Sequence, residues 1–100
     1  MRNIVLLCAQ GMSTGMLMNK MKDIALKTGY ECMINAYSIS QINVVATFAD
    51  CVLVGPQIRY ELDGVKKACP NIPVEMIDLA SYGRLDGAKV LAMAKKMIGD

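Results

Sequence analysis

The chain alternates between short apolar runs and longer segments with helical periodicity. Residues 3–8 are apolar almost throughout, and residues 50–54 and 74–77 form two further apolar runs. Short continuous apolar runs are typical of strands in a parallel sheet whose two faces are both covered. Residues 32–39 instead alternate, which indicates a fourth strand. One side of this strand would carry Met33, Asn35 and Tyr37, and the other Cys32, Ile34 and Ala36.

Apolar residues recur at helical spacing between and after these strands. The segments with this pattern are residues 14–28, 41–48, 58–69 and 87–98. Gly29 is a good terminator for the first of these helices, Ser40 can cap the second, and Pro70 ends the third. Residues 78–86 carry no clear periodicity, so we expect a loop between the last strand and the last helix.

This order of strands and helices predicts an α/β fold. Right-handed crossovers give, most simply, a Rossmann-like four-stranded parallel sheet in the order 2-1-3-4 with helices on both faces. With 100 residues, of which 54% are hydrophobic, we expect one domain that spans residues 1–100. Ligands of such folds bind beyond the carboxyl ends of the strands. The loops after the first, third and fourth strands are therefore the predicted site.

Composition excludes several classes of function. The net charge is only +2 and there is no Trp and no basic cluster, so nucleic-acid binding has little support. No apolar run reaches the roughly 20 residues of a membrane-spanning helix, and no signal peptide is recognisable, so we expect a cytoplasmic protein. Four Cys without C-x-x-C spacing and without any His favour reduced thiols and neither a disulfide scaffold nor a zinc site.

Cys8 is the residue with the clearest chemical signal. It ends the first apolar run and precedes a polar stretch that contains Gly11, Ser13, Thr14 and Gly15. A helix that begins about here directs free N–H groups and a partial positive charge at whatever lies above Cys8. Such a site would hold a phosphate and favour a thiolate. A buried cysteine beside an ordinary turn remains the alternative interpretation.

Known phosphate-loop patterns fit this stretch only in part. The Walker sequence requires Lys and then Ser or Thr after its second glycine, whereas Met16 follows Gly15. The dinucleotide fingerprint also fails, so no nucleotide, metal or other cofactor is expected. The Cys-x5-Arg pattern of small phosphatases is closer, but Thr14 occupies the place of the arginine. Without that guanidinium, a phosphocysteine could persist long enough to be passed on.

Three residues of the other two loops are candidates for the rim of the site or for contact with a partner. They are Gln57 after the third strand, and Tyr82 and Asp86 after the fourth. Asp86 stands where it could equally cap the last helix, and its position alone leaves the two roles open.

The segment from Ile4 to Leu17 resembles the phosphocysteine loop of the enzyme IIB component of the bacterial phosphoenolpyruvate-dependent sugar phosphotransferase system, lactose/cellobiose type. The motifs Val54-Gly55-Pro56-Gln57-Ile58, Tyr82-Gly83 and Asp86-Gly87 extend the similarity over nearly the whole chain. The order of the loop is more similar to the cellobiose and chitobiose branch than to the lactose branch. The resemblance places the phosphate-binding loop at Ala9, Gln10, Gly11, Met12, Ser13, Thr14, Gly15 and Met16.

The resemblance implies a phosphocarrier that acts in sugar uptake. Cys8 would accept a phosphoryl group from a phosphohistidine of enzyme IIA. It would then pass the group to a sugar bound by the membrane component IIC, for example cellobiose or chitobiose. A small cysteine phosphatase and a non-catalytic regulatory binding module are the alternatives. Release of phosphate without a partner would indicate the first, and binding that is indifferent to Cys8 would indicate the second.

Overall fold

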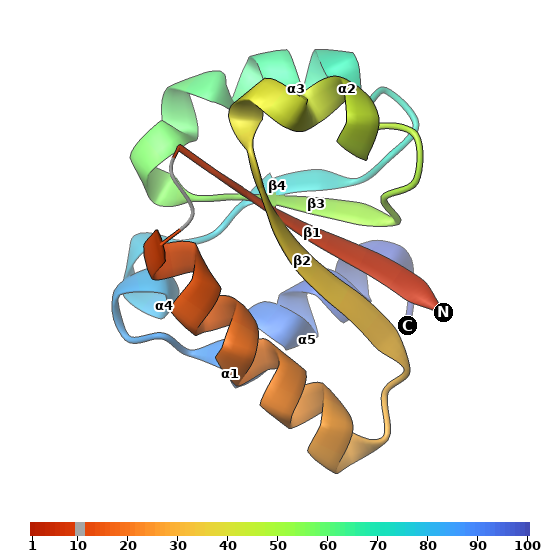
Figure 1. Cartoon of the computed structure of the whole chain (residues 1–100), viewed down its shortest axis with the longest axis vertical. Helices are drawn as coiled ribbons and strands as arrows, with labels where there is room; N and C mark the ends of the chain where they lie inside the picture. Colours follow the sequence, from red (N-terminus) through yellow and green to blue (C-terminus); the bar gives the residue numbers. More distant parts are fainter. Residues whose placement is uncertain (10–11) are drawn as a thin grey trace.

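The computed structural model describes residues 1–9 and 12–100, which form an α/β fold around a four-stranded parallel sheet (Figure 1). The strands are β1 (Arg2–Cys8), β2 (Cys32–Ser38), β3 (Cys51–Val54) and β4 (Val74–Met76). They lie in the order β2-β1-β3-β4, and each neighbouring pair is parallel. The predicted fold class, strand positions and strand order are confirmed.

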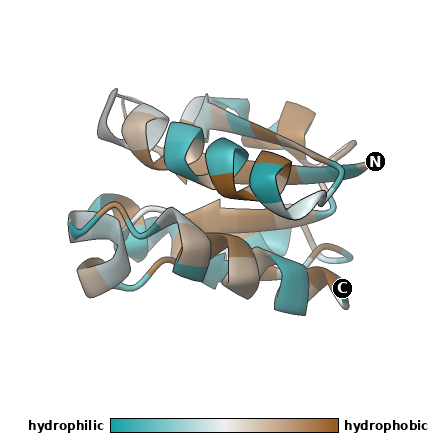
Figure 2. Cartoon of the chain, turned by 90° about the horizontal axis from the view of Figure 1, so that it is seen from below, coloured by the Kyte–Doolittle hydropathy of each residue, from teal (hydrophilic) through white to brown (hydrophobic). Residues whose placement is uncertain are grey.

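Helices cover both faces of the sheet, as Figure 1 shows. One face is covered by α1 (Met12–Thr28) and α5 (Gly87–Ile98). The other face is covered by η1 (Ile39–Gln41), α2 (Ile42–Val45), η2 (Pro56–Glu61) and α3 (Leu62–Ala68). A short helix, α4 (Leu79–Gly83), follows β4. Figure 2 looks onto the face covered by α1 and α5, whose residues alternate between hydrophilic and hydrophobic, with hydrophobic strand residues visible behind them.

The central strand β1 contributes side chains to two hydrophobic cores. Ile4 and Leu6 belong to the core under α1 and α5, whereas Val5 and Leu7 belong to the core under α2 and α3. All four side chains are buried. This alternation explains why the run shows no polar face, since each side of the strand is covered by helices. It also fixes the end of β1, and with it Cys8, in the middle of the sheet.

Helices α1 and α5 lie very close together at Gly87. A Cβ atom built on Gly87 would lie 2.7 Å from the backbone carbon of Lys20 and 2.8 Å from the backbone nitrogen of Met21. Contacts this short are not tolerated between atoms, so the crossing requires a residue without a side chain. The position of α1 against the sheet therefore depends on a glycine at the start of α5.

Two helices differ from the prediction. The helix predicted for residues 41–48 is the turn η1 followed by the single turn α2, and the cap is Ser38 rather than Ser40. The Ser38 hydroxyl accepts from the backbone N–H of Ser40, and the Gln41 side chain accepts from the N–H of Ser38. This capping box starts the helical turn directly after β2, earlier than Ser40 would.

The helix predicted for residues 58–69 is also divided. Pro56 starts the 3-10 turns of η2 directly after β3, and α3 begins only at Leu62. Ile58 has φ −117° and ψ 32°, outside the helical region, and its side chain is buried in the core. Burial of Ile58 therefore overrides regular helix geometry at this point. Residues 78–86 are not wholly a loop either, because they contain α4.

The two ends of the described chain meet at the amino end of the sheet. Arg2 donates two hydrogen bonds of 2.9 Å to the Asp100 carboxylate, and the Tyr30 hydroxyl donates to the same group at 2.6 Å. The Lys95 ammonium lies 4.6 Å from the centre of the Tyr30 ring. These contacts connect β1, the segment after α1 and α5 at the end of the sheet opposite Cys8.

Candidate functional site

Cys8 is the last residue of β1, and β1 lies between β2 and β3. Its side chain is buried, with 5% of the residue exposed, and its Sγ donates to the Tyr37 carbonyl of β2 across 3.7 Å. The sheet continues on both sides of this strand, so the thiol is held in the middle of the edge formed by the carboxyl ends of the strands. We call this edge, with the segments that follow β1, β3 and β4, the carboxyl edge.

The loop after Cys8 leads directly into α1. Ala9 is exposed, and α1 begins at Met12. The predictions for Gln10 and Gly11 lie outside the described residues, as do those for the side chains of Met12 and Ser13. The start of α1 is the feature that matters for chemistry. The first N–H groups of a helix have no intrahelical acceptor and favour an anion. Binding of a phosphoryl group by this helix start stays a prediction.

Thr14 is buried and does not lie on the surface of the protein. Only 1% of Thr14 is exposed, and its Oγ1 forms a hydrogen bond of 3.1 Å with the hydroxyl of Tyr82, which is 6% exposed. Gly15 is half-buried, whereas Met16 is 59% exposed on the outer side of α1. The structure thus brings Thr14 and Tyr82 together at the start of α1, and it leaves Met16 exposed to solvent.

The segment after β3 comes close to the end of β1 at Gly55. The Gly55 N–H donates to the Leu7 carbonyl at 2.9 Å. A Cβ atom on Gly55 would lie 3.2 Å from the Leu7 carbonyl oxygen, 3.2 Å from the Gln57 side-chain oxygen and 3.9 Å from the Tyr82 ring. Gln57 itself is exposed. A glycine therefore allows the three segments of the carboxyl edge to pack together, with Gln57 on the outside.

Asp86 is the N-cap of α5. Its carboxylate accepts from the Lys89 N–H at 3.1 Å, which is the capping role that the sequence left open. Its proposed part in the site stays a prediction. Helix α4, which carries Tyr82, was not predicted from the sequence. The available signal was Asp78 three residues before Ser81, since the Asp78 carboxylate accepts from both the N–H and the hydroxyl of Ser81 at 2.9 Å.

The Asp78 cap gives the protein a specific sensitivity to acid. Hydrogen bonds from Ser81 favour the carboxylate and lower the pKa of Asp78 below its usual value. Since the pKa is lower in the folded protein, the cap stabilises the fold above the unfolded-state pKa of about 4. That stability is lost as the pH falls through the folded-state pKa.

Thermal unfolding of the wild type and of Asp78→Asn, followed from pH 6 to pH 2, measures this effect. An asparagine caps a helix without titrating in this range. We expect the melting temperature of the wild type to fall more steeply below pH 4 than that of Asp78→Asn. Parallel curves for the two proteins would show that the cap does not contribute through its charge.

The other three cysteines differ from Cys8 in position. Burial raises the pKa of the Cys32 and Cys69 thiols, and burial together with the nearby Asp50 carboxylate raises the pKa of Cys51 to about 12. A raised pKa disfavours the nucleophilic thiolate. None of these three lies at the carboxyl edge, so among the four cysteines Cys8 alone places a thiol there.

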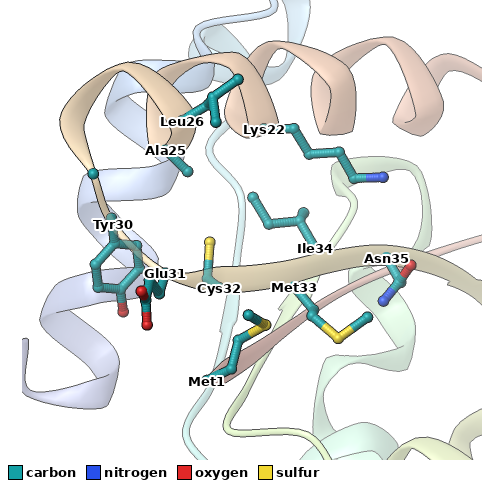
Figure 3. A pocket seen from close by; sticks show the side chains of 11 residues that line it. Met1, Lys22, Ala25, Leu26, Tyr30, Glu31, Cys32, Met33, Ile34 and Asn35 are labelled. Carbon is teal, nitrogen blue, oxygen red and sulfur yellow. The ribbon is translucent and has the colours of Figure 1, made fainter.

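A cavity of about 500 Å³ lies at the other end of the sheet, between α1 and β2 (Figure 3). Its lining includes Leu26 and Met33, which are exposed, and Figure 3 shows the Cys32 side chain pointing from β2 toward α1. The cavity contains no residue of the predicted phosphate site. The carboxyl edge, rather than this cavity, is therefore the candidate functional site.

A family model decides what kind of protein carries this site. The model described as "PTS system, Lactose/Cellobiose specific IIB subunit" matches residues 3–93. The chain belongs to this IIB family. Proteins of the family are sugar-specific components of the phosphotransferase system and, as a class, phosphotransferases. The resemblance seen in the sequence is thus confirmed at the level of the family.

Relatives of this IIB protein match it over nearly their full length. The oligo-beta-mannoside-specific EIIB component of Bacillus subtilis (strain 168) is 37% identical, with 98% of this chain and 97% of the relative covered. A galactose-specific component from Lactococcus lactis subsp. cremoris (strain MG1363) is 35% identical, as is a cellobiose-specific one from Lactococcus lactis subsp. lactis (strain IL1403). For each of these two, 95% of this chain and 94% of the relative are covered.

Solved structures agree with the family. The cellobiose-specific IIB component from Borrelia burgdorferi superposes with a TM-score of 0.84 at 31% identity, with 98% of this chain and 92% of that one covered. A lactose-specific IIB domain from Streptococcus pneumoniae gives a TM-score of 0.85 at 18% identity, with 96% of each chain covered. The second likeness shows the fold alone. In the part of the chain that the structure describes, no helix has the length and apolar character needed to cross a bilayer.

Proposed function

We propose that this IIB protein is a cytoplasmic phosphocarrier in which Cys8 transfers a phosphoryl group from enzyme IIA to a sugar bound by the membrane component IIC. The observation that carries the proposal is the placement of Cys8. It ends the central strand four positions before the start of α1, where a thiol could act as a nucleophile. Membership in the IIB family supplies the reaction class. No cofactor or metal takes part in the proposed transfer.

The first step is phosphorylation of Cys8. The Cys8 sulfur attacks the phosphorus of the IIA phosphohistidine in line, so that an S–P bond forms as the N–P bond breaks. The thiol proton passes to the nitrogen of the departing imidazole. Since this chain contains no histidine, the donor itself supplies the group that takes the proton. The N–H groups at the start of α1 stabilise the charge on the three phosphoryl oxygens.

The second step returns Cys8 to its starting state. A sugar hydroxyl presented by IIC attacks the phosphorus, and an O–P bond forms as the S–P bond breaks. The S–P electrons return to the Cys8 sulfur, which takes up the proton lost by the sugar hydroxyl. Both partners must reach the same sulfur in turn. The carboxyl edge suits this exchange because Met16 and Gln57 are exposed around the buried Cys8. Partner binding would also exclude water, which protects the phosphocysteine from hydrolysis.

Thr14 favours a carrier over a phosphatase. In the Cys-x5-Arg pattern, an arginine at this position holds the phosphate during hydrolysis. Here the position holds a buried threonine whose hydroxyl is bonded to Tyr82. No guanidinium can therefore act from position 14, so stabilisation of the hydrolytic transition state is weaker. This difference supports a phosphocysteine that survives until the sugar accepts it.

We propose a β-linked disaccharide, such as cellobiose or chitobiose, as the acceptor. The relatives named for oligo-beta-mannoside and for cellobiose support this class of sugar. Because IIC binds the sugar, the choice among such sugars rests mainly with that component.

The function can be tested in a reconstituted reaction that contains phosphorylated IIA, this protein and membranes that hold IIC. We expect formation of cellobiose or chitobiose phosphate that requires all three components. The same protein incubated alone with an aryl phosphate should release almost no inorganic phosphate. Rapid partner-free hydrolysis, with no transfer to a sugar, would instead identify a phosphatase.

A further inference from the structure

Tyr82 connects the three segments of the carboxyl edge although it lies 68 positions from Thr14 in the sequence. Its hydroxyl forms a hydrogen bond of 3.1 Å with Thr14 at the start of α1. Its ring packs beside Gly55, the residue that follows β3. Tyr82 itself belongs to α4, which follows β4. One side chain thus contacts the segments that follow β1 and β3 from a helix that follows β4.

Tyr82 is held firmly enough to fix the position of another residue. At the start of α4, the Asp78 carboxylate accepts two hydrogen bonds from Ser81. At its end, Leu85 has φ 53°, a left-handed conformation that is costly for a leucine, and the Asp86 N–H donates to the Ser81 carbonyl at 2.9 Å. The short helix is therefore fixed at both ends, which gives the Tyr82 hydroxyl a defined position.

Thr14 is the third residue of α1, so its placement sets the direction of the first N–H groups of the helix. Those N–H groups stabilise a phosphoryl group during its transfer only if they point at its oxygens. Misplacement of reacting groups by about 1 Å can lower the rate by about 100-fold. A buried hydrogen bond on Thr14 opposes movement of this turn.

We propose that Tyr82 is a positioning residue for phosphoryl transfer, which acts through Thr14 to hold the first turn of α1 in line with Cys8. The inference rests on the proposed function of Cys8 and adds a residue to its mechanism. With only 6% of Tyr82 exposed, its contribution comes from inside the protein and not from contact with IIA or IIC. The sequence had placed Tyr82 on the rim of the site.

Tyr82→Phe tests the inference because it removes the hydroxyl and keeps the ring beside Gly55. The measurement is the single-turnover rate of phosphocysteine formation from phosphorylated IIA, made well below the melting temperature. We expect a rate about tenfold below that of the wild type, which is less than the roughly 100-fold loss that a full misplacement can cause. The final amount of phosphocysteine should be the same as in the wild type. Tyr30→Phe is the matched control, since it removes a bonded tyrosine hydroxyl at the opposite end of the sheet. Its transfer rate should equal that of the wild type.

Further variants separate positioning from general destabilisation. If Tyr82 acts through Thr14, the double variant Thr14→Val/Tyr82→Phe should be no slower than Thr14→Val alone. Thr14→Ser, which keeps a hydroxyl, should keep most of the rate. The inference would be overturned if the rate losses of the two single variants multiplied in the double variant, or if Tyr82→Phe had the rate of the wild type. In either case, phosphorylation of the wild type on Cys8 would still support the proposed function. A wild type that forms no phosphocysteine would overturn both.

Discussion

Replacement of Cys8 by serine is expected to abolish sugar phosphorylation, with a loss of more than ~1,000-fold, as removal of a nucleophile typically gives. A serine hydroxyl stays protonated near neutral pH and needs a base to become a nucleophile. This chain has no histidine to serve as that base. The difference between sulfur and oxygen at one atom therefore decides the reaction. The rate of sugar phosphate formation with IIA and IIC present measures the loss.

Cys32→Ser is the matched control for this change. Cys32 opens β2 at the end of the sheet opposite the carboxyl edge, and it forms a register pair with Arg2, whereas Cys8 is paired with Ser38. We expect Cys32→Ser to retain nearly full transfer. Full activity in Cys8→Ser, or equal losses in both variants, would contradict the role of Cys8 as the phosphoryl acceptor.

Gly87→Ala is expected to destabilise the fold by about 1–3 kcal/mol, the usual cost of overpacking. The added methyl group would lie 2.7 Å from the Lys20 backbone, which belongs to a helix and cannot rotate away as a side chain can. Helices α1 and α5 must therefore separate. Against a total stability of about 5–15 kcal/mol for a domain of this kind, the loss is large. Unfolding in urea, with the midpoint and slope compared with those of the wild type, measures it.

The same replacement of glycine by alanine at position 64 is expected to stabilise the fold. Gly64 lies in α3, and a Cβ atom there would meet nothing within 4 Å. Alanine is preferred to glycine within helices, so this variant should gain about 0.5 kcal/mol. A Gly87→Ala protein as stable as Gly64→Ala would show that α1 and α5 do not depend on the close approach at Gly87.

The arrangement of the sheet was predictable because its strongest signals are local. The apolar run of β1 and the stripe of α5 each stand out over a few residues, and crossover rules then give the strand order. The errors arise where neighbouring residues compete. Ser38 and Ser40 could both cap a helix after β2, and only the bond between the Gln41 side chain and the Ser38 N–H decides between them. Ile58 fits a helical stripe but leaves helical geometry when its side chain is buried.

The sequence predicted those features of the candidate site that depend on the residues of a single loop. Cys8 stands out because a thiol follows an apolar run and precedes a glycine-bearing stretch. The bond between Thr14 and Tyr82 leaves no such local signal, since it depends on how α4 packs against α1. Capping of α5 by Asp86 was equally open until the structure showed its bond to Lys89. Contacts between loops far apart in sequence require the fold itself.

The most direct test of phosphoryl transfer through Cys8 is the intact mass of the protein after incubation with phosphorylated IIA, followed by peptide mapping at a pH where phosphocysteine survives. We expect one phosphoryl group per chain, located on Cys8 and absent from Cys8→Ser. Addition of IIC and its sugar should then remove it and yield sugar phosphate. No adduct on Cys8, while the same IIA phosphorylates a known acceptor, would contradict the account and leave the loop without its assigned reaction.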